Sequence, residues 1–298
     1  MAHWPISFFV QVYLSNPTWG NHKNIFADAH VETRSYRYFD KETVGLDFEG
    51  LMADLDAAPA GAVVLLHGCA HNPTGVDPTK AQWEQIADLC QHKGLLPFFD
   101  VAYQGFASGS LDEDAFAPRL FESRGIEFIC AQSYSKNLGL YGERVGALNF
   151  VLADAQSAGR VLSQVKRLAR AMYSNPPVHG ARIVATVIGD PELYAAWKAE
   201  MQSMAGHING VRTALEAALK KREPSRDWSF VTRQIGMFSF TGLSAAQVAY
   251  MAKTWSIYMT SNGRISLAGL SSGKVDYLAE AMVDAIHNAP GEAATSKL

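Results

Sequence analysis

The sequence lacks several features that mark large classes of proteins. Its 298 residues include 26 lysines and arginines against 29 aspartates and glutamates, a formal net charge of −3, so no basic excess indicates a nucleic-acid partner. No apolar run is long enough to cross a membrane. Cysteine is scarce and odd in number, which predicts reduced thiols in a reducing compartment. The three cysteines, each in or beside an apolar run, are Cys69, Cys90 and Cys130.

Two further absences concern the start of the chain. No GxGxxG motif opens a helix there, so the glycines do not predict a dinucleotide-binding fold. Residues 1–10 (MAHWPISFFV) contain neither the basic segment of a secretory signal nor the arginines of a transit peptide. We therefore expect a cytoplasmic protein.

The order of apolar runs predicts an α/β fold. Helical patterns alternate with strand-like runs at about 10–14, 62–67, 95–101, 127–133 and 145–151, an arrangement typical of a largely parallel sheet. One helix is predicted to begin at Asp77-Pro78 with Asp77 as its cap, and a long one to run from about Glu192 to Arg222. Two more helices and four more strands follow, which predicts a smaller α+β domain. These strands are expected at 228–231, 235–240, 257–259 and 265–267.

The segment SYSKNLGLYGERVG, residues 133–146, carries the most informative lysine. Lys136 follows an apolar run, so its amine is expected at a buried strand end, where desolvation lowers the pKa of an amine. A neutral amine can form a Schiff base. Ser133 and Ser135 supply hydroxyls and Arg144 a fixed cation, a combination suited to a phosphate. The alternative interpretation is a solvated surface lysine.

Polar residues also end two other apolar runs. Asp100 ends the run LLPFFD, and Tyr103 follows three residues later. A carboxylate at a buried strand end needs a partner. A pyridinium nitrogen is such a partner, and an aspartate on that nitrogen together with a lysine Schiff base is the protein side of pyridoxal phosphate chemistry. The run that ends at His67 leads into the loop GCAHNPTG, which carries Asn72.

Seven motifs then identify a family. In chain order they are PTWGNH, AHNPTG, FFDVAYQGFASG, SYSKNLGLYGERVG, YSNPPVHGARIVA, GMFSFTGL and GRISLAGL. In order and spacing they resemble the aspartate aminotransferases, most closely the plant-type eukaryotic branch, from about Val10 to about Ile286. The resemblance implies the fold of the fold type I pyridoxal phosphate enzymes. Residues 1–205 would form part of the larger, mainly parallel cofactor-binding domain, and residues 206–298 the smaller α+β domain.

The resemblance also implies roles for single residues. Lys136 would hold pyridoxal 5′-phosphate as a Schiff base and move the proton between the substrate Cα and the cofactor. Asp100 would keep the ring nitrogen of the cofactor protonated, and Tyr103 would bond the phenolic oxygen of the ring. Asn72 would bond the same oxygen and the substrate, and Trp19 would lie over the ring. Ser133 and Arg144 would bind the phosphate, and Arg264 would bind the substrate α-carboxylate. Phe238 would form a wall of the site, and His22 and His67 would lie behind Asp100. No metal ion is implied.

Arg170 carries the prediction of substrate class. In the family, the arginine five residues before the asparagine of SNPP binds the distal carboxylate of the substrate from the other subunit, and Arg170 stands five residues before Asn175. Two arginines for two carboxylates imply aspartate, glutamate, oxaloacetate and 2-oxoglutarate as substrates. The resemblance therefore also implies a homodimer.

The resemblance does not extend to the N-terminal part of the family, which supplies a dimer-clasping arm, part of the smaller domain and a helix N-terminus at the cofactor phosphate. We therefore expect a weakened dimer and weaker cofactor binding. Two functions follow: an aspartate aminotransferase, or a catalytically impaired remnant that acts only as a cofactor-binding or dimerisation partner. A more distant alternative is an aromatic-preferring transaminase, which would keep Arg264 and relax the use of Arg170. The family also has plastid and mitochondrial members, which are alternatives to the cytoplasm.

Overall fold

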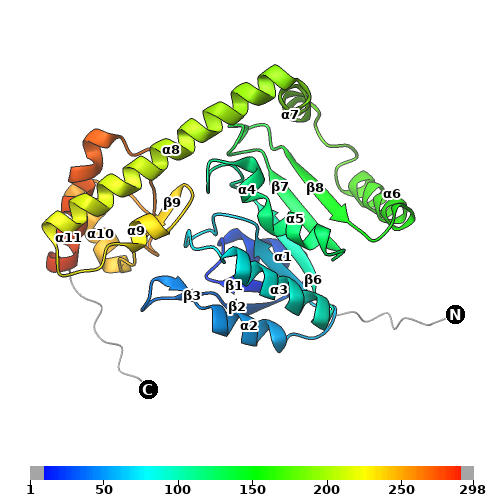
Figure 1. Ribbon diagram of the computed structural model, residues 1–298, viewed down its shortest axis with the longest axis horizontal. Helices are drawn as coiled ribbons and strands as arrows, with labels where there is room; N and C mark the ends of the chain where they lie inside the picture. Colours follow the sequence, from blue (N-terminus) through cyan, green and yellow to red (C-terminus); the bar gives the residue numbers. More distant parts are fainter. Residues whose placement is uncertain (1–9, 290–298) are drawn as a thin grey trace.

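A six-stranded sheet forms the centre of the molecule (Figure 1). The structure is a computed structural model that describes residues 10–289, so the interpretation of residues 1–9 lies outside the described residues. The strand order is β2-β1-β5-β6-β7-β8. In chain order the strands are β1 Gln11–Asn16, β2 Glu32–Arg37, β5 Val63–His67, β6 Leu96–Val101, β7 Phe128–Ser133 and β8 Gly146–Val151.

The α/β prediction is confirmed. All pairs from β2 to β7 are parallel, and only β8 runs antiparallel to its neighbour. The five strands expected in this region all form, within two residues of the expected bounds. β2 was not predicted, because its residues ETRSYR are mostly polar. It is an edge strand in which only Tyr36 is buried, so its sequence carries no apolar run.

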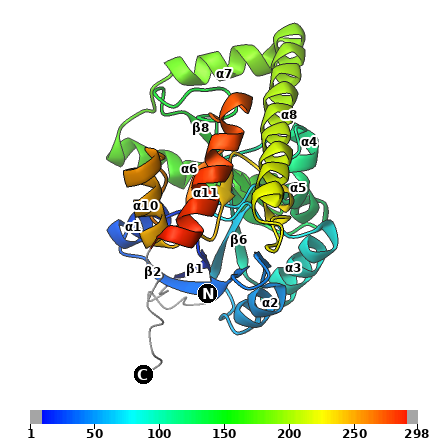
Figure 2. The same ribbon diagram turned by 90° about the vertical axis from the view of Figure 1, so that its left-hand side faces the viewer.

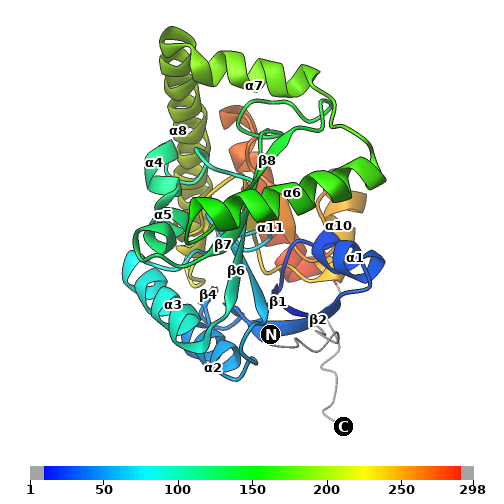
Figure 3. The same cartoon turned by 90° about the vertical axis from the view of Figure 1, so that its right-hand side faces the viewer.

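Helices cover both faces of the sheet. On one face, β5, β6 and β7 share a core with α2 Phe48–Asp56, α3 Lys80–Lys93 and α5 Phe116–Ser123. On the other face, a smaller cluster of β1 and β5 side chains packs against Phe26 of α1 Asn21–Asp28. Outside these layers lie α6 Ala155–Met172, next to β8, and α7 His179–Gly189, at the end of α8 (Figure 3). The remaining short elements are α4 Leu111–Asp114, β3 Phe39–Asp40 and β4 Gly45–Leu46.

The start of α3 differs from the prediction. Thr79, and not Asp77, caps the helix: the Thr79 hydroxyl accepts from the Gln82 backbone, and the Gln82 side chain accepts from the Thr79 backbone. Asp77 instead accepts hydrogen bonds from the backbone N–H groups of Ala70 (2.6 Å) and His71 (2.8 Å). The carboxylate therefore fastens the loop that follows β5.

The long helix α8 Pro191–Arg222 confirms the second helix prediction. The Asp190 side chain caps it by accepting from the backbone N–H groups of Glu192 and Leu193. Its C-terminal half shares a second core with α10 Ala245–Trp255 and α11 Val275–Asn288, and α11 lies along α8 (Figure 2). Within residues 10–289, no helix combines the length and the apolar character needed to cross a membrane. A domain boundary between residues 205 and 206 stays a prediction.

Two of the four C-terminal strand predictions are wrong. Residues 228–231 lead into the short helix α9 Phe230–Arg233, because Trp228 and Val231 are both buried at a spacing of three, which fits a helical turn. Residues 257–259 have no regular structure. The other two predictions are confirmed: β9 Phe238–Phe240 is shorter than predicted, β10 Arg264–Ser266 is shifted by one residue, and the two strands pair antiparallel. The 3-10 helix Ser272–Lys274 precedes α11.

Candidate active site

A cavity of about 410 Å³ lies at the carboxyl ends of the parallel strands, the edge at which open α/β sheets bind their ligands. The loops after β1, β5, β6 and β7 form most of it, and β9 and β10 close it. Most of the residues predicted from the sequence meet here. Those that line the cavity are Trp19, Asn72, Asp100, Tyr103, Ser133, Lys136, Arg144, Phe238 and Arg264.

Lys136 lies in the loop that follows β7, half-buried in the cavity wall. Its Nζ stands 5.3 Å from the centre of the Tyr103 ring. Burial lowers the pKa of Lys136, the Asp100 carboxylate raises it, and the Arg144 guanidinium lowers it again, with a net result below the usual value for lysine. The loop is held from α8, where the Trp197 indole donates to the Asn137 carbonyl at 2.7 Å.

Asp100 stands at the end of β6, where it pairs in register with His67 of β5 and Ala131 of β7. His22 Nε2 donates to Asp100 Oδ2 at 3.0 Å. Burial raises the pKa of Asp100, but the hydrogen bond from His22, with smaller electrostatic contributions of the neighbouring histidines and Lys136, outweighs it and holds this pKa below the usual range. Asp100 is therefore an ionised carboxylate at neutral pH that faces the cavity.

A directed chain of hydrogen bonds supports Asp100 from behind. The Asn72 backbone N–H can only donate, and its acceptor is His67 Nδ1 at 3.3 Å. His67 must then carry its proton on Nε2, which faces the Thr18 hydroxyl at 3.2 Å, and that hydroxyl faces His22 Nδ1 at 2.8 Å. Burial lowers the pKa of His67 to about 4, which agrees with a neutral ring. The chain leaves His22 with its proton on Nε2, aimed at Asp100.

Tyr103, Asn72 and Arg264 form the opposite wall. Asn72 Nδ2 donates to the Tyr103 hydroxyl oxygen at 3.2 Å, and Arg264 Nη1 donates to Asn72 Oδ1 at 2.6 Å. The Arg264 guanidinium also lies 4.4 Å from the centre of the Phe238 ring, a cation–π contact. Burial raises the pKa of Tyr103 to about 12, so its hydroxyl keeps its proton at neutral pH. Arg264 has no carboxylate partner in residues 10–289, which leaves its charge available to an anion.

The remaining wall is more open. Trp19 is 39% exposed, and its ring meets His22 edge-on with centroids 5.2 Å apart. The Ser133 hydroxyl accepts from the Ser135 backbone at 3.2 Å, and Arg144 donates to the Tyr141 carbonyl at 2.9 Å. Hydroxyl and guanidinium groups at one end of the cavity are donors suited to a phosphate.

A comparison with known families decides the class of protein. The model of the family described as aminotransferase class I and II matches residues 9–282. This chain belongs to the family of class I and II aminotransferases. The resemblance predicted from the seven motifs is thereby confirmed.

Curated relatives of this aminotransferase are similar over most of its length. A chloroplastic aspartate aminotransferase of Arabidopsis thaliana is 62% identical over 279 residues, which are 93% of this chain and 62% of that protein. The mitochondrial aspartate aminotransferase P2 of Lupinus angustifolius is 63% identical over 238 residues, 80% of this chain and 52% of that protein. The chain thus spans less than two thirds of the length of these relatives.

A solved structure supports the fold assignment of this aminotransferase. The broad specificity aminotransferase from Leishmania mexicana superposes with a TM-score of 0.91 at 47% identity, over 94% of this chain and 69% of that one. The fold class predicted from the sequence is confirmed.

Arg170 is the one predicted site residue that lies away from the cavity. It stands in the last turn of α6, exposed, with its guanidinium on the Ser174 hydroxyl. Arg170 is predicted to belong to the site of a second subunit, and its place outside this cavity leaves that prediction untested. His22 and His67 do not line the cavity: His22 bonds Asp100 directly, and His67 is linked to it through Thr18 and His22.

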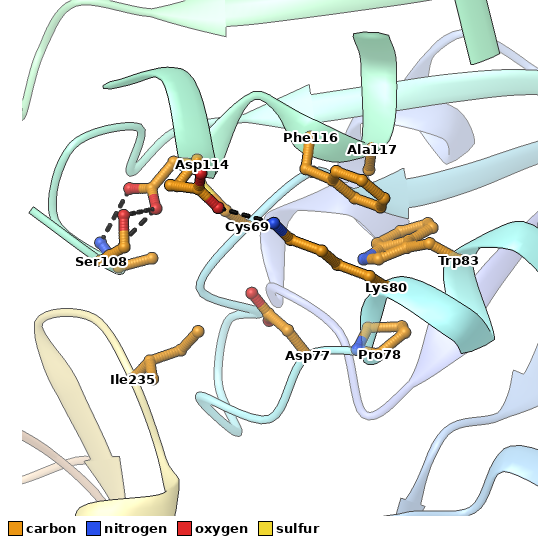
Figure 4. Close-up of a pocket in the computed structure, with 13 residues that line it drawn as sticks. Cys69, Asp77, Pro78, Lys80, Trp83, Ser108, Asp114, Phe116, Ala117 and Ile235 are labelled. Carbon is orange, nitrogen blue, oxygen red and sulfur yellow. Dashed lines mark hydrogen bonds and ion pairs between the residues drawn. The ribbon is translucent and has the colours of Figure 1, made fainter. Parts of the chain in front are cut away.

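Several residues that position the site were missed from the sequence. Thr18 bridges the two histidines, and its place inside the motif PTWGNH was the available signal. Asp77 and Asp114 lie on the far side of the site loops, around a second cavity of about 250 Å³ (Figure 4). Asp114 accepts from the backbone of Gly105, Ala107 and Ser108, just after Tyr103. These two carboxylates fasten the loops that carry Asn72 and Tyr103.

Proposed function

We propose that this chain provides the active site of an aspartate aminotransferase, which transfers an amino group reversibly from L-aspartate to 2-oxoglutarate to give oxaloacetate and L-glutamate. One observation carries the proposal: a single cavity contains the Lys136 amine, the ionised Asp100 carboxylate and the Arg264 guanidinium, which has no carboxylate partner in residues 10–289. The curated relatives named aspartate aminotransferase, at up to 63% identity, support the same reaction.

The residues of the cavity fit pyridoxal 5′-phosphate. Asp100 offers a carboxylate for a protonated ring nitrogen, Trp19 offers an aromatic face, and Ser133 and Arg144 offer donors for a phosphate. A related aminotransferase from Burkholderia pseudomallei, 43% identical with a TM-score of 0.90, was solved covalently bound to pyridoxal phosphate. When bound, the cofactor supplies an electron-poor ring that draws in the electrons of a broken Cα–H bond.

Lys136 does the proton transfer of the proposed reaction. Its lowered pKa increases the share of the neutral amine, which is the form that acts as a nucleophile and as a base. In this role Nζ would take the proton from the substrate Cα and give it up to the cofactor. The hydrogen bond from Trp197 to the next carbonyl holds the loop in place during these steps.

Asp100 holds a proton on the ring nitrogen of the cofactor. Its charge is kept by the hydrogen bond from His22, whose orientation depends in turn on Thr18 and His67. On the other wall, Asn72 and the Tyr103 hydroxyl are placed to bond a ring oxygen. Arg264 binds the α-carboxylate of the substrate in a bidentate manner.

Arg170 of a second subunit binds the distal carboxylate in this proposal, which requires a homodimer. The surface of α6 supports the requirement, because the helix buries none of its residues. Its apolar side chains Leu162, Leu168 and Met172 are 53%, 62% and 76% exposed, an arrangement typical of a surface that another protein covers. The solved structures also include aromatic-amino-acid aminotransferases, so the use of Arg170 separates the proposal from the aromatic alternative.

We place the protein in a reducing compartment, and in the cytoplasm first. The three cysteines are unpaired, and two of them are buried. Relatives carry cytoplasmic, chloroplastic and mitochondrial names.

Borohydride reduction tests the role of Lys136. We expect reduction of the chain loaded with pyridoxal phosphate to fix one cofactor on the peptide that contains Lys136, because borohydride converts a Schiff base into a stable amine. Mass spectrometric peptide mapping gives the position. Lys80→Ala, a variant at the neighbouring cavity, should keep the label, and Lys136→Ala should lose it. A label on any other lysine would remove the assignment.

A further inference from the structure

Arg212 of α8 is a buried cation outside the site described above. Its side chain is 2% exposed and among the largest that the protein buries completely. No carboxylate pairs with it within residues 10–289, and its Nε has no hydrogen-bond partner. Its bonds go to backbone carbonyls: Nη1 donates to Val231 at 2.7 Å, and Nη2 donates to Gly236 at 2.9 Å and to Phe238.

The cost of this arrangement indicates a specific role. Taking a charge out of water is unfavourable, and an apolar side chain of similar volume is often as stable or more stable at such a place. All three acceptors belong to residues 231–238, which we call the bracketed segment. Between Gln234 and Met237 this segment has no regular structure, so the guanidinium supplies bonds that a helix or sheet would otherwise supply.

The bracketed segment is packed against the loop that carries Asn72. The Ile235 backbone N–H donates to the Gly75 carbonyl at 2.8 Å. Gly236 has a φ of +84°, and a Cβ on it would lie 2.6 Å from the Ala70 Cβ, so no side chain fits there. Figure 4 shows Ile235 beside the loop that carries Cys69 and Asp77. A shift of the segment would therefore move the loop.

The segment ends in a residue of the active site. Phe238 begins β9, and its ring lies 4.4 Å from the Arg264 guanidinium and 5.8 Å from the Tyr103 ring. Asn72 holds the same guanidinium by a hydrogen bond of 2.6 Å. Both groups that fix the direction of Arg264 thus depend on the bracketed segment.

We propose that Arg212 is a positioning residue for substrate binding, which clamps the bracketed segment so that Phe238 and Asn72 aim Arg264 at the carboxylate of the ligand. The carboxylate as ligand rests on the proposed function. The clamp itself rests on the contacts of Arg212 alone.

The variants Arg212→Lys and Arg212→Met test the clamp. Lysine keeps the charge, but its single ammonium group lacks the planar fork that reaches three carbonyls. The matched control is Arg222→Met, because Arg222 lies on the same helix and bonds Ala218 and Asp276 instead of the segment. Hydrogen–deuterium exchange is followed in peptides that cover residues 70–76 and 230–240. The affinity of the cofactor-loaded chain for succinate, a dicarboxylate without an amino group, is measured by calorimetry.

In Arg212→Lys we expect amide exchange about tenfold faster at Ile235, with faster exchange confined to residues 70–76 and 230–240. The succinate Kd should rise about tenfold, which corresponds to the loss of about one hydrogen bond to a charged group. Arg212→Met should show a larger change, and Arg222→Met none. Unchanged exchange in both regions of Arg212→Lys, or faster exchange throughout the chain, would overturn the proposal. The exchange measurement on Arg212→Lys decides this even if Arg212→Met does not fold. A wild-type chain that fails to bind succinate counts against the proposed dicarboxylate substrates, while the exchange data still decide the role of Arg212.

Discussion

Asp100→Ala should slow amino transfer by roughly 10²- to 10⁴-fold, because breaking a buried charge pair costs about 3–5 kcal/mol and each 1.36 kcal/mol corresponds to a factor of ten in rate. The structure gives Asp100 the surroundings of a permanent anion, with His22 donating to it at 3.0 Å and its pKa held below the usual range. Without this carboxylate nothing in the cavity holds a proton on the cofactor ring nitrogen.

Two conservative variants make the test of Asp100 sharper. Asp100→Asn keeps the shape and removes the charge, so its rate should be close to that of Asp100→Ala. Asp100→Glu keeps the charge and should retain part of the rate. Steady-state turnover of cofactor-saturated protein measures both. An Asn variant with the wild-type rate would contradict the role of the carboxylate.

Arg170→Ala should raise the barrier for aspartate by about 2–5 kcal/mol and the barrier for phenylalanine much less, because removing one partner of a buried charge pair leaves the substrate carboxylate unpaired. The ratio of kcat/KM for the two amino acids measures this difference. The exposed Arg167 on the same helix gives the matched control Arg167→Ala, for which the ratio should not change. Equal losses with aspartate and phenylalanine in Arg170→Ala would remove the dicarboxylate assignment.

A mixing experiment tests whether Arg170 acts across subunits. Arg170→Ala and Lys136→Ala chains should each be nearly inactive with aspartate. In a mixed dimer, one of the two sites combines an intact Lys136 with an intact Arg170 of the partner subunit. We therefore expect mixing to restore part of the activity. No recovery in demonstrated mixed dimers would place Arg170 outside the partner's site.

The sequence predicted the central strands well because burial determines their composition. β5 and β6 contribute side chains to the hydrophobic clusters on both faces of the sheet, and β7 contributes to the cluster on one face. Their sequences are therefore apolar runs with polar residues at their ends. β2 was missed because an edge strand exposed to solvent needs no such run. Residues 228–231 were misassigned because Trp228 and Val231 are buried in a helical turn that is too short to show a helical period.

The membership of the site was predictable, and its geometry was not. The motifs identified the residues that line the cavity, but no spacing in the sequence indicates that Thr18 orients two histidines toward Asp100. Arg212 carried no signal either. An arginine ordinarily lies in solvent, and only the fold shows that this one is enclosed by the bracketed segment.

Transfer of ¹⁵N tests most directly that the cavity around Lys136 exchanges amino groups between dicarboxylic acids. The chain loaded with pyridoxal phosphate is incubated with [¹⁵N]aspartate and 2-oxoglutarate, and the products are followed by NMR, with folded Lys136→Ala as the control. We predict that [¹⁵N]glutamate and oxaloacetate form together in the wild-type chain and that Lys136→Ala forms neither. A cofactor-loaded wild-type chain that produces no labelled glutamate, or a Lys136→Ala variant that produces it at the same rate, would contradict this account.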